Sequence, residues 1–98
     1  MSHAQQITST IRSIAPVGEY FHIVFEAPTI AEYVEPGHFV AVAVGGVGSG
    51  MLLRRAFSIH NATPGDSIEV IVAAHGQGTQ WLTETSAGQQ VDIIAPLG

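Results

Sequence analysis

Two short motifs in the sequence have the residue types and spacing to hold an anion. Arg54 and Arg55 are adjacent and make up two of the three lysine or arginine residues in the chain. The segment 76–79, Gly-Gln-Gly-Thr, precedes a predicted helix, where unpaired backbone amides and the positive end of the helix dipole favour a phosphate. Together the guanidinium groups and the helix amides would form the two halves of a pyrophosphate clamp. Taken separately, the spacing of the arginines favours a solvated surface pair, and the Gly-Thr segment is explained by an ordinary helix cap.

The spacing of the other reactive side chains does not favour metal or hydrolytic chemistry. The five histidines are never two, three or four residues apart, so no local pair of metal ligands exists. Ser58 and His60 lie close in the sequence but lack the Gly-x-Ser-x-Gly turn of a hydrolase nucleophile. The glycine-rich stretch 45–50 lacks the Gly-Lys-Ser/Thr ending of a phosphate-binding loop, and we expect a plain hairpin connection there. With no cysteine, these residues can hold no disulfide or cysteine-ligated iron–sulfur cluster.

The composition indicates one folded domain that spans residues 1–98. Hydrophobic residues make up 46% of the chain and charged residues 11%, which suits a packed core and excludes disorder. A net charge of −5 with no lysine argues against a nucleic-acid partner, because phosphate backbones are held by many cations at once. The polar N-terminus and the lack of an apolar run of about 20 residues argue against secretion and membrane insertion. We therefore expect a soluble cytoplasmic protein.

Strand signals that recur at short intervals predict an all-β protein. One stretch, 79–84, instead has Thr79 placed as an N-cap and lacks strand alternation, which predicts a short helix stopped at Gly88. The predicted fold is a six-stranded antiparallel Greek-key barrel with one short helix. The strands are expected at 6–15, 20–25, 38–44, 52–60, 67–74 and 91–94, with the fourth and fifth paired, an irregular stretch at 29–35 and a turn at 61–66.

Four motifs in register resemble those of the FAD-binding domain of the ferredoxin-reductase superfamily. Arg55-Ala56-Phe57-Ser58 resembles the family's Arg-x-Tyr/Phe-Ser strand signature, with phenylalanine where many members have tyrosine. The segment 36–39, Pro-Gly-His-Phe, is similar to its Pro-Gly-Gln-Phe, with His38 in place of glutamine. The segment 76–82 resembles its Gly-x-Gly-Thr-x-x-Leu, and 95–98 its Gly-Pro-Leu-Gly.

This resemblance implies a set of residues that bind FAD. Arg55 would pair with the pyrophosphate, Phe57 would pack against the isoalloxazine, and Ser58 would bond near the flavin N5. In a regular strand Arg55 and Ser58 face opposite sides, so both reach one ligand only if the strand ends, bulges or offers backbone atoms at Ser58. The phosphates would rest on Gly76, Gly78 and Thr79, and the ribose and adenine on the strand before them. The full expected set is Arg55, Ala56, Phe57, Ser58, Val72, Ala73, Ala74, His75, Gly76, Gly78 and Thr79.

The resemblance also implies NAD(P)H-dependent electron transfer, in which FAD takes up a hydride and passes single electrons to an iron–sulfur cluster. Within the superfamily, the residues around Arg55 and the Gly-x-Gly-Thr segment look most like the electron-transfer subunit of dihydroorotate dehydrogenase, which works with a catalytic dehydrogenase subunit in pyrimidine biosynthesis. The family's nucleotide-binding domain and cysteine-ligated cluster are not in these 98 residues, so we expect a domain incomplete for turnover. The alternatives are a noncatalytic β-barrel interaction module and the flavin domain of an oxygenase reductase or a flavin reductase.

Overall fold

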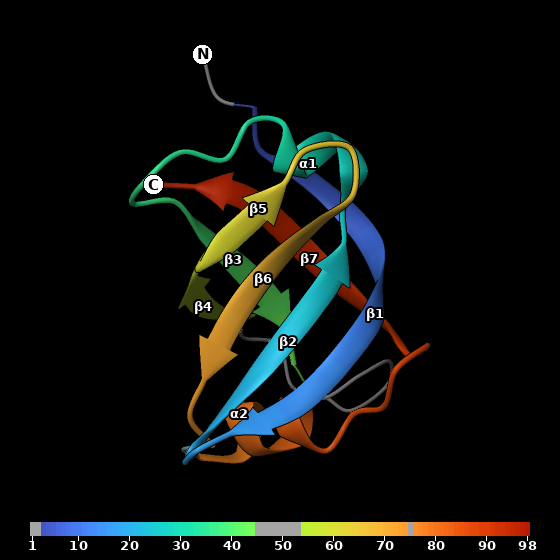
Figure 1. Ribbon diagram of the computed structural model, residues 1–98, viewed down its shortest axis with the longest axis vertical. Coiled ribbons are helices and arrows are strands. Elements are labelled where there is room, and N and C mark those ends of the chain that lie inside the picture. Colours follow the sequence, from blue (N-terminus) through green and yellow to red (C-terminus); the bar gives the residue numbers. More distant parts are fainter. Residues whose placement is uncertain (1–2, 45–53, 75) are drawn as a thin grey trace.

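The computed structural model describes residues 3–44, 54–74 and 76–98, and it shows an all-β fold with two short helices (Figure 1). The predicted glycine-rich connection at 45–50, the first two residues of the predicted fourth strand and His75 lie outside the described residues. The elements are β1 (Gln5–Val17), β2 (Tyr20–Glu26), α1 (Pro28–Ala31), β3 (Phe39–Ala43), β4 (Arg54–Ser58), β5 (Asn61–Thr63), β6 (Ser67–Val72), α2 (Gly76–Thr83) and β7 (Gln90–Leu97).

The strands form one antiparallel sheet in the order β4-β3-β7-β1-β2-β6-β5. The long strand β1 pairs first with β7 and then with β2, and its register with β2 shifts between Ile11 and Ser13. Such an irregularity bends a strand, which lets β1 belong to both halves of a curled sheet. The edge strands β4 and β5 follow each other in the chain, so the curled sheet brings its two ends together at residues 59 and 60 (Figure 1).

The prediction of an all-β antiparallel fold is confirmed, but the expected six-stranded barrel with one helix is wrong in detail. Seven strands are present, and no hydrogen-bonded ladder joins β4 to β5 within the described residues, so closure into a barrel is not seen. The extra strand β5 occupies the start of the expected turn, because the reversal is confined to 64–66, where Gly65 has a φ of +77°. As a result β5, and not the predicted long fourth strand, pairs with β6. The helix α1 lies in the stretch expected to be irregular.

The helix α2 begins three residues earlier than the sequence predicts. Thr79 lies inside it instead of capping it, and it ends at Thr83, ahead of the predicted stop at Gly88. Gly76 and Gly78 are poor helix formers, which is why local propensity places the start after them. Leu82 is fully buried, and packing of this kind commonly outweighs weak propensity in short helices.

Alternate residues of the strands fill one hydrophobic core. Each strand except β4 and β5 contributes at least one side chain with under 5% of its surface exposed, and α1 and α2 cover the ends with Ile30 and Leu82. Among the described residues, no helix is long and apolar enough to cross a membrane. The core consists of Ile11, Ile23, Phe25, Ala27, Ile30, Ala31, Val40, Val42, Val44, Ile68, Val70, Val72, Leu82, Val91, Ile93 and Ala95.

Candidate functional site

The edge strand β4 presents its two faces to different surroundings. Arg55 lies opposite Val42 and Phe57 opposite Val40 in the ladder with β3, and both valines are fully buried. Because paired residues share a face, Arg55 and Phe57 lie on the core side of the sheet. Ser58 lies on the opposite side, because the β3–β4 register is continuous. The strand ends at Ser58, which is one of the conditions under which Arg55 and Ser58 can serve the same ligand.

The two adjacent arginines differ in whether a carboxylate pairs with them. The Nη2 atom of Arg54 lies 2.5 Å from an Asp92 carboxylate oxygen, and its Nη1 donates a hydrogen bond to the Asp92 carbonyl at 3.3 Å. Arg55 is exposed and has no ion pair or hydrogen bond in the described part of the chain. The hypothesis that both arginines serve one anion site is therefore wrong for Arg54, because neighbouring residues of a strand point to opposite faces.

The third arginine is also engaged by carboxylates. The Arg12 Nη1 donates to Asp66 at 2.5 Å, and its Nε lies 3.8 Å from Glu26. This hydrogen bond, followed by one from Ser67, lowers the pKa of Asp66, and the same bond with Asp66 raises the pKa of Arg12. Among the arginines, Arg55 is thus the one whose charge no carboxylate of the described residues offsets.

Arg55 and the start of α2 lie at the same end of the fold. The strand β5 follows β4 in the chain and runs in the same direction. The strand β6 pairs with β5 in antiparallel orientation and also contacts β4. The end of β6 at Val72 and the Arg55 end of β4 therefore point toward the region where α2 begins (Figure 1). The first turn of α2 contains Gly76 and Gly78 and carries no acidic residue. The first amides of a helix, here from Gly76, have no carbonyl before them in the helix to bond, so this end combines them with a guanidinium that has no carboxylate partner among the described residues.

The remaining residues of the predicted FAD site differ in solvent exposure. Phe57 is half-buried and packs against the core, so one side of its ring is already covered. Ala56 and Ser58 are exposed. Val72 is buried, and the chain becomes progressively more exposed through Ala73 and Ala74. Val72 can thus offer backbone atoms but little side-chain surface.

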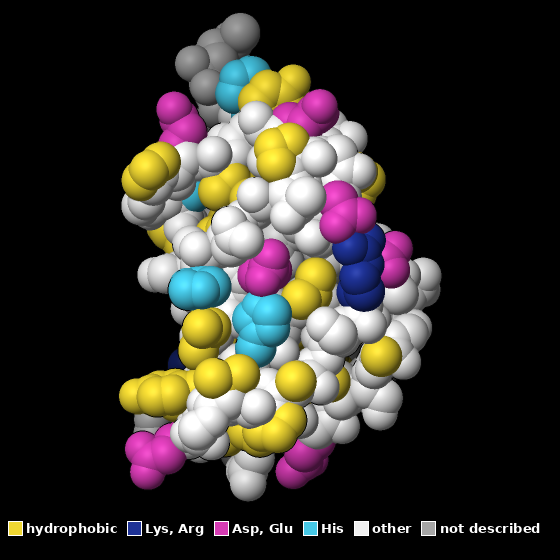
Figure 2. Space-filling view, viewed as in Figure 1, with side chains coloured by type: hydrophobic (Ala, Val, Ile, Leu, Met, Phe, Trp, Pro, Cys, Tyr) yellow, Lys and Arg dark blue, Asp and Glu magenta, His cyan; other side chains and the backbone are white. Residues whose placement is uncertain are grey.

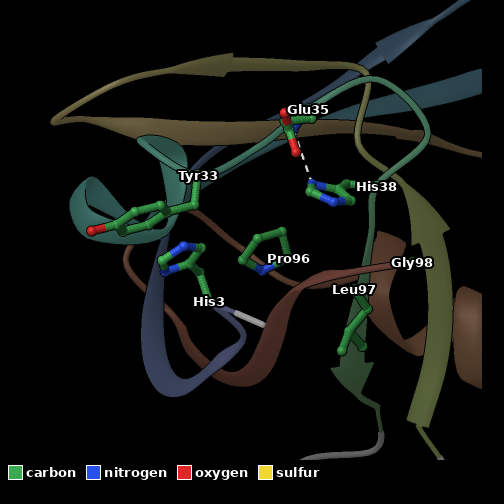
Figure 3. A pocket seen from close by; sticks show the side chains of 7 residues that line it. All are labelled: His3, Tyr33, Glu35, His38, Pro96, Leu97 and Gly98. Atoms are coloured by element: carbon green, nitrogen blue, oxygen red, sulfur yellow. Dashed lines mark hydrogen bonds between the residues drawn. The ribbon is translucent and has the colours of Figure 1, made fainter. Parts of the chain in front are cut away.

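A cavity of about 340 Å³ lies between the N-terminal segment, the residues after α1 and the end of β7 (Figure 3). The His3 and Tyr33 rings stack with centroids 4.0 Å apart, and the Nδ1 of His38 accepts a hydrogen bond from the Glu35 amide at 2.9 Å. That bond assigns the proton of a neutral His38 to Nε2. The lining residue Leu97 and Ser58 both pair with Phe39, so the cavity and Ser58 are near each other on the outer face of the sheet.

A second cavity, of about 310 Å³, lies beside the segment that leads into α2. Its lining residues are Glu19 and Tyr20, from the turn between β1 and β2, and Ala73 and Ala74. The β2–β6 ladder creates it by pairing Phe21 with Val72. Sequence reasoning missed Glu19 and Tyr20, because no local pattern reveals which distant strand will pair with β2. Within the described residues, no group of three histidine, aspartate or glutamate side chains is placed to hold a metal.

The sequence is similar to an electron transfer subunit of a known dehydrogenase. It is 35% identical over 79 residues to the electron transfer subunit of dihydroorotate dehydrogenase B (NAD(+)) from Desulforamulus reducens, a match that covers 80% of this chain and 30% of the relative. The subunit of the same name from Bacillus cereus is 34% identical over 79 residues, with the same coverage. The chain thus spans about a third of the length of the curated relatives it matches. No protein-family model matches the sequence.

Solved structures share the fold. A ferredoxin reductase of carbazole 1,9a-dioxygenase has a TM-score of 0.80 at 16% identity, covering 97% of this chain and 30% of that one. An NADH-dependent reduced ferredoxin-NADP oxidoreductase has a TM-score of 0.78 at 19% identity, covering 94% of this chain and 33% of that one. The resemblance to ferredoxin-reductase-type flavin domains, and to the dihydroorotate dehydrogenase electron-transfer subunit among them, is confirmed.

Proposed function

We propose that this relative of the dihydroorotate dehydrogenase electron-transfer subunit binds FAD and acts as the flavin domain of an NAD(P)H-dependent electron-transfer oxidoreductase of pyrimidine biosynthesis. The observation that carries the proposal is the uncompensated charge of Arg55 at the end of the fold where α2 begins. Both features favour an anion, and the resemblance supports the FAD pyrophosphate as that anion.

The residues present fit a pyrophosphate. A guanidinium presents several N–H donors in one plane and can bind two phosphate oxygens at once. The first turn of α2 supplies backbone amides from Gly76 onward, and the glycines at 76 and 78 let a ligand approach the backbone closely. Since no acidic side chain lies in that turn, no carboxylate of the helix competes for these amides.

The other residues of β4 would position the flavin ring. The resemblance implies that Ser58 bonds near N5 and that Phe57 packs against the isoalloxazine. The half-buried position of Phe57 leaves part of its ring for that contact, and the core holds the rest in place. When bound, FAD supplies the capacity to accept a hydride and to release electrons one at a time. The NAD(P)H site, the iron–sulfur cluster and the catalytic dehydrogenase subunit belong to the proposed whole enzyme.

The proposal is tested by titrating the purified chain with FAD and following the quenching of flavin fluorescence. Arg55→Ala should weaken binding by about 1.5–3 kcal/mol, the usual worth of a hydrogen bond to a charged group, which is roughly 10- to 150-fold in Kd. Ser58→Ala should weaken it less, because a neutral hydroxyl contributes about 0.5–1.5 kcal/mol. Arg12→Ala is the matched control and should bind as the wild type does, because Arg12 is held by Asp66.

Two results would contradict the proposal. Absence of saturable FAD binding would favour the noncatalytic interaction module. Equal weakening by Arg55→Ala and Arg12→Ala would show that the effect comes from net charge and not from a built site. Binding of FAD that depends on Arg55 would support the flavin domain.

A further inference from the structure

The half-buried imidazole of His38 bonds to the turn that leads into β3. Its Nδ1 accepts a hydrogen bond from the Glu35 amide at 2.9 Å, and the His38 amide donates to the Glu35 carbonyl at 3.1 Å. Gly37, between them, has a φ of +91°, a conformation that residues with side chains rarely adopt. Figure 3 shows the ring beside Glu35, at the edge of the cavity of about 340 Å³. The turn 35–38 is thus held by two hydrogen bonds, and one of them is made by a titratable ring.

Backbone contacts connect this turn to the end of β4. The His38 carbonyl accepts a hydrogen bond from the Ile59 amide at 3.1 Å, and Phe39 pairs with Ser58 in the β3–β4 ladder. Because β4 ends at Ser58, these contacts with the start of β3 hold the strand end in place. A change in the turn 35–38 therefore reaches Ser58, which the resemblance places near the flavin N5.

The bond between the ring and the Glu35 amide requires a neutral His38. A neutral imidazole has one acceptor nitrogen, here Nδ1, whereas a protonated imidazole has two N–H donors and no acceptor. A protonated ring would thus face the Glu35 amide with a donor. The Glu35 side chain also lines the cavity, so its carboxylate offers a charged ring a competing partner. Histidine is the side chain that ordinarily changes its charge between about pH 5 and 8.

Other titratable groups lie near the same turn. Those that line the cavity with His38 are His3, Tyr33 and Glu35, while the lining segment 96–98 has no titratable side chain. On the side of β4, His60 lines a separate cavity of about 330 Å³ that also includes Glu35 and Ile59. Figure 2 shows histidine side chains on the outer face of the sheet as well, over β2 and β6. A pH dependence of the wild type alone would therefore not identify His38, and each neighbouring histidine needs its own control.

We infer that His38 is a positioning residue for the flavin: its neutral ring fixes the turn 35–38 and, through that turn, Ser58, and protonation of the ring releases both. The inference rests on the proposed function, since it assumes that FAD lies along β4 with Ser58 near N5. It gives flavin binding a pH dependence that a side chain without a titratable group at position 38 would not produce.

The test is a titration with FAD at about pH 8 and at about pH 5.5, followed by the quenching of flavin fluorescence. The wild type should bind FAD roughly 2- to 12-fold more weakly at the lower pH, which corresponds to the loss of one neutral hydrogen bond. In His38→Asn the side-chain oxygen is as far from the backbone as Nδ1 is and does not titrate, so this variant should bind equally at both pH values. His38→Ala lacks the acceptor and should bind weakly at both.

Three controls show whether the effect comes from this ring and passes through Ser58. His60→Gln and His3→Gln remove the neighbouring histidines and should keep the wild-type pH dependence. Ser58→Ala should lose most of that dependence, because the bond that His38 positions is then missing. In NMR spectra of the chain without FAD, the chemical shift of the Glu35 amide should follow the titration of His38 and stay constant in His38→Asn.

The outcomes separate this inference from the proposed function. FAD binding that is equally tight at both pH values, or wild-type binding by His38→Ala at pH 8, would overturn the role of His38 and leave flavin binding at Arg55 standing. An unaltered pH dependence in His38→Asn or Ser58→Ala would also overturn it, as would its loss in His60→Gln or His3→Gln. A Glu35 amide shift that does not follow the His38 titration would overturn the bond on which the inference depends. Absence of FAD binding at both pH values would overturn both proposals.

Discussion

Leu82 anchors the helix whose first turn is proposed to hold the phosphates. Its side chain is fully buried against the core, and its carbonyl accepts a hydrogen bond from the Thr85 hydroxyl at 2.6 Å. Replacing a buried leucine with alanine costs about 2–5 kcal/mol, because apolar contacts are lost and a cavity remains. A domain of this size has only about 5–15 kcal/mol of stability in total. Leu82→Ala should therefore lower the free energy of unfolding by a large fraction and weaken FAD binding as α2 loosens.

The assay is urea unfolding followed by two probes. Trp81 is the single tryptophan of the chain and lies in α2, so its fluorescence reports on the helix, while far-UV circular dichroism reports on the sheet. Both transitions should move together to a lower urea midpoint in Leu82→Ala. Leu97→Ala is the control. Because Leu97 is only half-buried, its replacement should lower the free energy of unfolding by less. A loss below about 1 kcal/mol for Leu82→Ala would refute the anchoring of α2, since that is well under the range for a buried leucine.

Two further predictions concern the stability of the sheet. The lowered pKa of Asp66 means that its ion pair with Arg12 stabilises the fold above the unfolded pKa of about 4, and that this contribution is lost as pH falls through the lower folded value. Asp66→Asn should thus be less stable than the wild type at pH 7, and the difference in the free energy of urea unfolding should shrink as the pH falls below about 4. A difference that does not change with pH would contradict this. Ser9 is 1% exposed and donates to the Glu26 carbonyl at 2.8 Å, so Ser9→Ala should cost about 1–3 kcal/mol in thermal unfolding. An unchanged melting temperature of Ser9→Ala would contradict this prediction, because it would show that the Glu26 carbonyl does not depend on the Ser9 hydroxyl.

Local sequence patterns predicted most of the strands, because alternation of apolar and polar residues records which face of a strand is buried. The pattern failed at Asn61–Thr63, where a strand of three residues is too short to show alternation. It also failed at the start of α2, where the burial of Leu82 outweighs the low helix propensity of glycine.

By itself the sequence determined the absence of cysteine chemistry, the scarcity of cations and the motifs that resemble a flavin domain. Which groups meet was decided by the tertiary structure, because strand pairing joins residues that are distant in the chain. The register of β4 directs Arg54 to Asp92 and leaves Arg55 without a carboxylate partner among the described residues. The β2–β6 ladder likewise brings the turn at Glu19 and Tyr20 against the residues that lead into α2. Neither outcome is encoded locally, since a change of one residue in register would reverse the face of every side chain in the strand.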